Sequence, residues 1–178
     1  WVLELHGTMR CGLSSRIDGR LDQIQQETFS NHEVRIWKNG ETVVFLPKPD
    51  NDILFVFTHF LKHFYIGGIG LRQICDWSRL LWTYSSTINL SSLESRLCEM
   101  GLTTEWKAFG AFAVAYLGMP ADKMPLYSAE SRWVRKANSI CDFVMTVGNF
   151  GHNRDSRFYE KYPYLIRKAC SFGRRFGD

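Results

Sequence analysis

Two histidines four residues apart are the side chains best spaced for chemistry in this sequence. His59 and His63 fall on one face of a helix predicted over residues 50–65, because positions i and i+4 are neighbours on a helix. Two imidazoles at this spacing can bind zinc, but the protease motif also needs a glutamate beside the first histidine, and phenylalanine stands there. A metal site would take Asp76 or His6 as its third ligand. We expect instead that the pair lines a cleft or contacts neighbouring helices.

A second pair, Arg72 and Asp76, lies four residues apart on the next predicted helix. Such a pair contributes only a few tenths of a kcal/mol when exposed, which leaves Arg72 able to bind a phosphate. Lys62, on the histidine helix, is a weaker phosphate candidate. The glycines of residues 67–70 lack the Lys-Ser/Thr of a phosphate loop, so they predict a tight turn between helices.

Glu4 and His6 share one face of a strand predicted over residues 1–6, where apolar residues alternate. A carboxylate two positions from an imidazole can ligate a divalent cation or orient the ring. The alternative for Glu4 is a charged residue on a solvated strand edge.

The elements that must position these residues form a small β portion followed by a helical bundle, an α+β fold. Asn39-Gly40 between two apolar runs predicts a hairpin over residues 33–46, with both turn residues at positive φ. Residues 15–29 are read as an exposed helix or an irregular excursion. Asp50 or Asn51 is the expected cap of the histidine helix, and Ser91 or Ser92 that of a later one. Further helices are predicted over residues 71–84, 91–100, 105–117, 129–147 and 154–172. We divide the chain into a β portion, 1–50, and a helical domain, 51–178.

Composition limits the class of protein. Hydrophobic residues make up 45% of the 178, including 13 Phe, 7 Tyr and 6 Trp, which excludes a disordered chain. No stretch reaches the roughly 20 apolar residues of a membrane helix. The five cysteines are scattered without a Cys-x-x-Cys motif, which favours a reducing, cytoplasmic location over a disulfide framework.

Positive charge is concentrated late in the chain. Residues 131–178 hold ten Lys/Arg against four Asp/Glu. A basic segment of this kind is typical of a solvated helix face; the alternative hypothesis is that it contacts an anionic partner.

The order of these motifs resembles a known family. Leu3-Glu4-Leu5-His6, a hairpin, His59-x-x-x-His63, a glycine turn and Gly70-Leu71-Arg72-Gln73-Ile74-Cys75-Asp76-Trp77 follow one another. This order is similar to that of the uncharacterised nucleotidyltransferase-like family of bacterial polysaccharide loci, a divergent branch of the polymerase-β-type nucleotidyltransferases. The resemblance covers residues 1–117.

The resemblance implies an enzyme that uses a nucleoside triphosphate and Mg²⁺, with a hydroxyl of a sugar or related acceptor displacing pyrophosphate. Glu4 matches the third metal-binding carboxylate and is the expected catalytic residue. The family's Gly-Ser turn and Asp-x-Asp pair are not found and would precede Trp1. The chain is therefore expected to be the C-terminal portion of a longer enzyme, inactive by itself. The resemblance also implies that the substrate-binding residues of the cleft are His6, His59, Lys62, His63, Arg72 and Asp76.

Two alternatives stay open. The first is a non-catalytic binding or scaffolding module of the same fold. The second is a metal-dependent hydrolase built on His59, His63 and Asp76.

Overall fold

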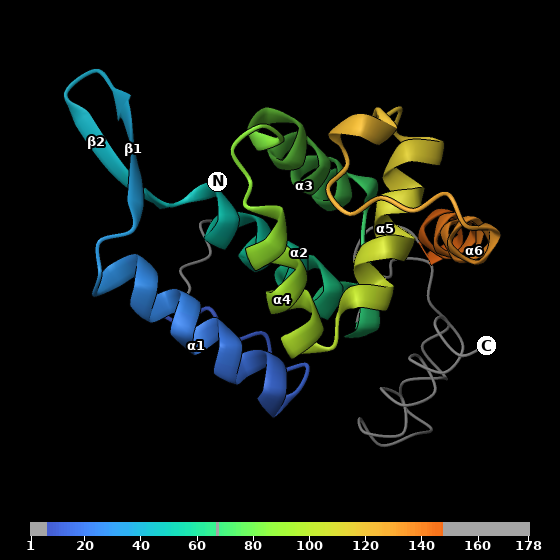
Figure 1. Cartoon of the computed structure of the whole chain (residues 1–178), viewed down its shortest axis with the longest axis horizontal. Helices are drawn as coiled ribbons and strands as arrows, with labels where there is room; N and C mark the ends of the chain where they lie inside the picture. The colour runs from blue at the N-terminus through green and yellow to red at the C-terminus, as the bar shows by residue number, and fades with distance from the viewer. Residues whose placement is uncertain (1–6, 67, 148–178) are drawn as a thin grey trace.

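The computed structural model describes residues 7–66 and 68–147, which form the expected α+β fold. A helix precedes a two-stranded hairpin, and further helices follow it (Figure 1). The predicted strand at residues 1–6 and the predicted helix at 154–172 lie outside the described residues. The elements are α1 (Ser15–Phe29), β1 (Val34–Asn39), β2 (Thr42–Pro47), α2 (Pro49–Ile66), α3 (Leu71–Tyr84), α4 (Leu90–Met100), α5 (Thr103–Tyr116), a short 3₁₀ turn (Ala121–Lys123) and α6 (Ser131–Val147).

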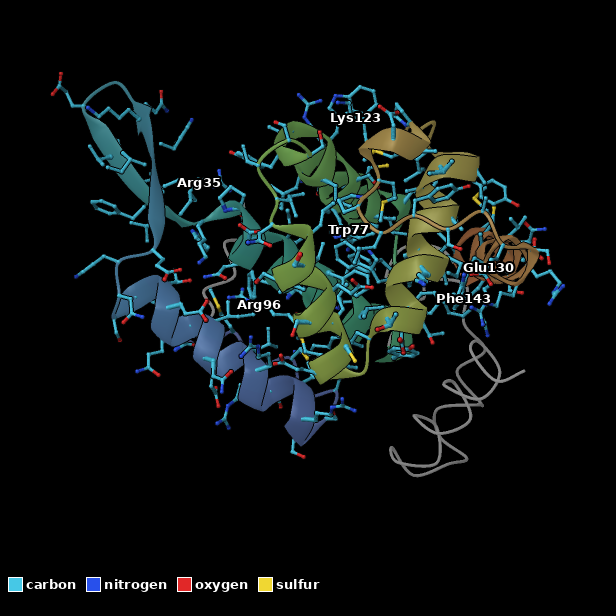
Figure 2. All side chains as sticks on the ribbon, viewed as in Figure 1. Arg35, Trp77, Arg96, Lys123, Glu130 and Phe143 are labelled. Carbon is cyan, nitrogen blue, oxygen red and sulfur yellow. The ribbon has the colours of Figure 1, made fainter. Side chains whose placement is uncertain are left out.

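A cluster of large aromatic side chains joins α2, α3 and α5. Phe57 on α2 has its ring centroid 5.2 Å from that of Trp77 and 4.9 Å from that of Trp106. The two indoles stand edge to face at 5.0 Å, the favourable arrangement for aromatic quadrupoles. All three side chains are buried, and Trp77 lies in the middle of the helices in Figure 2. This cluster fixes how α2, which carries the histidines, packs against α3.

Residues 15–29 form a regular helix, as the first interpretation of that segment has it, but one face of the helix is buried rather than exposed. Ile17, Leu21 and Ile24 are buried at helical spacing in the same core as the later helices. The expected domain boundary near residue 50 stays a prediction.

A buried polar network also fastens α1 to the bundle. Arg96 of α4, 8% exposed, donates to Glu27 Oε2 of α1 at 2.8 Å and to Asn51 Oδ1 of α2 at 2.7 Å. Figure 2 shows Arg96 among these three helices. These two hydrogen bonds join three elements that lie far apart in sequence, although the buried Arg96 Nε has no partner among the described residues.

Both predicted helix caps are wrong. The side chain of Asn89 caps α4, accepting from the Ser92 N–H at 3.0 Å, so neither predicted serine is the cap. At α2 the helix begins at Pro49, where a proline's missing N–H costs nothing. Asn51 is buried inside the helix and used by the Arg96 network.

The hairpin is confirmed, but its turn lies one residue later than predicted. Asn39 pairs with Thr42, which leaves Gly40 and Glu41 as the turn, and of these Gly40 alone has a positive φ, +59°. A glycine at the first central position is typical of a type II′ turn. The hairpin projects from the helices (Figure 1).

The base of the hairpin is anchored by Arg35. Its guanidinium donates to Asp52 of α2 and, at 3.0 Å, to the Tyr84 hydroxyl at the end of α3. Burial raises the pKa of Asp52, and the hydrogen bond and charge of Arg35 only partly oppose that rise. Beyond this anchor the hairpin is open to solvent, with the side chain of Phe45 65% exposed.

Candidate functional site

The histidine pair has the geometry that its spacing predicts. Both side chains are half-buried on α2, and their Nε2 atoms lie 3.2 Å apart, with the ring centroids 4.8 Å apart and the rings edge to face. One Nε2 must donate to the other, so at least one ring is neutral in this arrangement. His59 also lies beside the Phe55 ring, at 6.0 Å between centroids. His59 is therefore held between Phe55 and His63, and the pair can offer a proton or a lone pair to a neighbour.

Arg72 and Asp76 lie on the exposed side of α3. Arg72 Nε and an Asp76 carboxylate oxygen are 3.8 Å apart, and the two side chains are 91% and 64% exposed. An ion pair with this separation and this exposure to solvent is weak. The Arg72 guanidinium is therefore available to bind an anion. Lys62 is half-buried on α2, on the turn that carries His59 and His63.

The predicted metal ligands do not assemble within the part of the chain that the structure describes. Among residues 7–66 and 68–147, no three His, Cys, Asp or Glu side chains form a group that could hold a metal ion. Asp76 therefore does not complete a metal site with His59 and His63, and the hydrolase alternative loses its proposed ligands. Glu4 and His6 lie outside the described residues, and their roles stay predictions.

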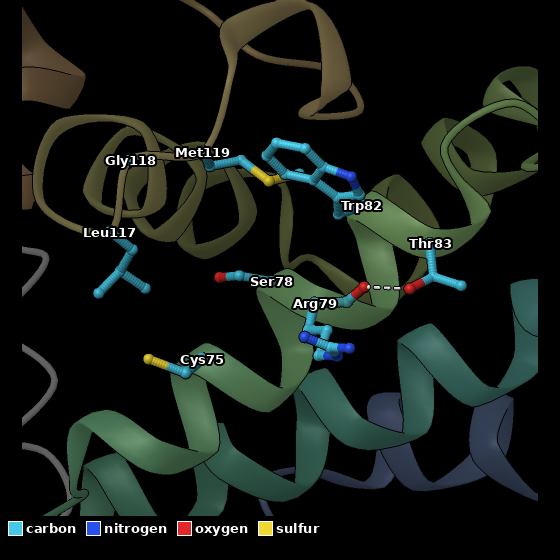
Figure 3. Close-up of a pocket in the computed structure, with 8 residues that line it drawn as sticks. All are labelled: Cys75, Ser78, Arg79, Trp82, Thr83, Leu117, Gly118 and Met119. Atoms are coloured by element: carbon cyan, nitrogen blue, oxygen red, sulfur yellow. Dashed lines mark hydrogen bonds between the residues drawn. The ribbon is translucent and has the colours of Figure 1, made fainter.

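A groove of about 350 Å³ lies along α3, between that helix and the segment after α5 (Figure 3). Arg79 and Trp82 line it from α3, and Met119 lies across from the Trp82 indole. Trp82 is 52% exposed. Within the described ranges, the guanidinium of Arg79 has no hydrogen-bond or ion-pair partner. The groove thus combines an aromatic face with a cation whose charge no described residue neutralises.

Sequence reasoning did not find this groove. Its walls come from segments about forty residues apart, α3 and residues 117–119, which only the packing of α3 against α5 brings together. A signal existed in the spacing: Arg79 follows Arg72 by seven residues, which is two helical turns, so the two cations share a face of α3.

The basic segment is described only over α6. There Arg132 pairs with Glu130 at 2.8 Å, and its guanidinium lies 4.4 Å from the centre of the Trp133 ring. Residues 148–178 lie outside the described residues, and the anionic partner stays a prediction. None of the helices in the described ranges is both long enough and apolar enough to cross a membrane.

Comparison with known proteins identifies the family. The sequence profile of a family described as uncharacterised nucleotidyltransferase matches residues 2–118. The match includes the histidine pair, the Arg72–Asp76 pair and most of the groove on α3, and it ends before α6. No curated protein and no solved structure matches the chain. Since the profile spans well over half of the sequence, the chain belongs to the family of uncharacterised nucleotidyltransferases.

Proposed function

We propose that this chain forms the substrate-binding helical part of an enzyme that transfers a nucleotidyl group from a nucleoside triphosphate to a hydroxyl of an acceptor, such as a sugar. The family match over residues 2–118 is the observation that carries the proposal. The described part of the chain supports a role in substrate binding, because it offers exposed cations, an exposed indole and a polar histidine pair rather than a cluster of carboxylates.

The exposed face of α3 is the proposed nucleotide-binding surface. Arg72 and Arg79 lie two turns apart, about 10 Å along the helix axis, and guanidinium groups bind phosphate oxygens with paired hydrogen bonds. Trp82 adds an exposed indole in the groove next to Arg79. An indole can stack on any of the nucleobases, because each base has a flat aromatic face. The groove therefore suits a ligand with a planar ring and an anionic group.

The histidine pair is the proposed contact to the acceptor. A ring nitrogen of His59 or His63 can accept a proton from a hydroxyl or donate one to it. The two rings orient each other through their Nε2 contact, so each offers a defined direction. We assign them a positioning role toward the acceptor hydroxyl.

The described residues do not fit the Mg²⁺ site that the family resemblance implies, because they provide no group of three metal-ligating side chains. The Mg²⁺ requirement depends on Glu4, outside those residues, and on further carboxylates. We therefore assign the described side chains to substrate binding and to no chemical step at a metal.

The test is calorimetric titration of ATP, CTP, GTP and UTP, with and without Mg²⁺, into the wild-type chain and into Arg72→Ala, Arg79→Ala and Glu4→Ala. Loss of one phosphate contact is expected to weaken binding about tenfold for either arginine variant. Arg135→Ala is the matched control, an exposed arginine on α6 outside the family match, and should bind as the wild type does. Release of pyrophosphate in the presence of sugar acceptors measures transfer.

The outcomes separate the proposal from its main alternative. Nucleotide binding that the arginine variants weaken supports the surface on α3. Binding without pyrophosphate release, in the chain and in any longer protein that contains it, favours the non-catalytic module. If that longer protein binds none of the four nucleotides, the proposal is wrong.

A further inference from the structure

The hairpin carries apolar side chains that the described residues leave open to solvent. On one of its faces Ile36, Val43 and Phe45 are 59%, 46% and 65% exposed. Ile36 lies directly opposite Phe45 in the strand pairing, so the two side chains share this face with Val43. The hairpin projects from the helices (Figure 1), and none of the three belongs to the core. Because two strands alone seldom form a stable sheet in water, this surface suits the addition of a further strand.

The outer edge of β2 has backbone groups available for such a strand. The Lys48 N–H, directly after β2, donates to the Glu33 carbonyl at 3.0 Å, so it points toward β1. The direction of these groups alternates along an antiparallel strand, so the N–H and C=O groups of Val43 and Phe45 point away from β1. Among the described residues, β2 pairs only with β1, and no described strand bonds these outward groups.

The two edges of the hairpin differ in charge. From Thr42 to Pro47, β2 carries no charged side chain. The other strand, β1, carries Arg35 and Lys38, and a lysine on an edge strand disfavours pairing with a further strand. The outer edge of β2 can therefore accept one strand, whereas the outer edge of β1 opposes further growth of the sheet.

We infer that two copies of this chain associate through the outer edges of their β2 strands, which then form the centre of a four-stranded antiparallel sheet. A two-fold axis beside Val44 places Val43 opposite the partner's Phe45, and each such pair can exchange both its N–H and C=O groups. The same register places these two apolar side chains next to each other on the exposed face. Lys38 remains at both outer edges, so the sheet is expected to stop at a dimer.

The charges at the ends of β2 favour this antiparallel arrangement. Glu41, directly before β2, is exposed and has no ion-pair partner among the described residues. In a parallel arrangement the two Glu41 carboxylates would lie side by side and repel each other. In the antiparallel register they lie at opposite ends of the interface. Each then comes near Lys48 of the other copy, which also pairs with Glu33 of its own copy.

The size of the interface predicts a weak dimer. β2 has six residues, so one edge of it is about 20 Å long, and it covers far less than the roughly 800 Å² per partner of a standard stable interface. We therefore expect a dissociation constant of the order of 0.1 mM. The inference does not rest on the proposed transferase function, because it uses neither the histidines nor α3.

Sedimentation equilibrium from about 10 µM to 1 mM, a range that spans the expected dissociation constant, measures this association. The average mass of the wild-type chain should rise with concentration from that of one chain toward that of two. Val43→Lys places a cation on the edge of β2, as Lys38 does on β1, and should weaken association at least tenfold. Ile36→Lys is the matched control, an equally exposed apolar residue on the same face but one strand away from the interface, and should associate as the wild type does.

Cross-linking tests the register. Val44 should lie directly opposite the partner's Val44 in a non-hydrogen-bonded pair, with the Cα atoms about 4.5 Å apart, and a disulfide can span that distance. The test uses a background in which every cysteine except the buried Cys11 is replaced by serine. There, Val44→Cys should form a covalent dimer on air oxidation. Thr42→Cys should not, because its two copies should lie about 14 Å apart.

Each contrary outcome overturns the inference. A mass that stays that of one chain up to 1 mM would do so, and this is also the result expected if another segment of the chain covers the edge of β2. Assemblies larger than a dimer, association of folded Val43→Lys equal to that of the wild type, or equal cross-linking of the two cysteine variants would also contradict it. If Val43→Lys does not fold, the mass of the wild type and the cross-linking still decide it.

Discussion

Removal of the Arg96 side chain should unfold the chain at a much lower urea concentration. In Arg96→Ala, the buried Asn51 Oδ1 loses its donor, which costs about 1–3 kcal/mol. The Glu27 carboxylate loses its partner too, but its side chain is 24% exposed and water can reach it. The cost for that ion is therefore well below the 3–5 kcal/mol typical of a fully buried pair. The total expected loss of unfolding free energy is about 3 kcal/mol.

Urea unfolding followed by far-UV circular dichroism measures this loss. With a slope of about 2–3 kcal/mol per M, the midpoint should fall by about 1 M or more. Arg132→Ala is the matched control, because Arg132 also forms a pair with a glutamate at 2.8 Å but is 55% exposed. Its removal should lower the midpoint much less, because an exposed ion pair and the contact of its guanidinium with the Trp133 ring are each worth about 1 kcal/mol or less. Equal midpoints for Arg96→Ala and Arg132→Ala would show that burial does not decide the strength of these pairs, which would refute the reasoning.

Three further outcomes are expected. Phe57→Ala should lower the unfolding free energy by about 3–5 kcal/mol, because it opens a cavity among the indoles that join α2, α3 and α5; urea unfolding measures it. For Glu105, burial raises the folded-state pKa above the ordinary 4.5, so the native state holds its proton more tightly and stability is lost as pH rises through the folded pKa. Glu105→Gln should remove that loss, so wild type and variant should diverge as pH rises, measured as Tm from about pH 4 to pH 8; parallel curves would contradict it. Finally, exposed Cys75 should react with a thiol reagent at neutral pH while Cys11 does not, because burial raises the pKa of the Cys11 thiol to about 11; mass spectrometry of the labelled peptides checks this.

Local patterns were enough to predict α2 to α6, whereas residues 15–29 were left open between a helix and an irregular segment. The bounds of α3 follow from the sequence, because Ile74, Trp77 and Leu81 bury one face and Gly70 interrupts the pattern before it. The hairpin was likewise predicted from Asn39-Gly40, although the strand pairing then placed its turn one residue later. Periodicity determines which face of an element is buried, and it does so without knowledge of the partner.

Features that depend on a distant partner could not be predicted. Asparagine is a residue type that favours helix caps. Asn51 is instead buried within the helix, where its Oδ1 accepts a hydrogen bond from Arg96, 45 residues away. The same limit applies to the candidate site. The i,i+4 pairs on α2 and α3 follow from local geometry, whereas the failure of Asp76 to join the histidines depends on how the two helices pack.

The hairpin has a consequence for the dynamics of the chain. None of its residues belongs to the buried core, and a two-stranded ribbon is marginal in water by itself. Its attachment to the helices depends on the contacts of Arg35 with Asp52 and Tyr84. It should therefore open as a separate cooperative unit, so that its amide protons exchange with solvent far faster than those of α2 and α5 while the helices stay folded.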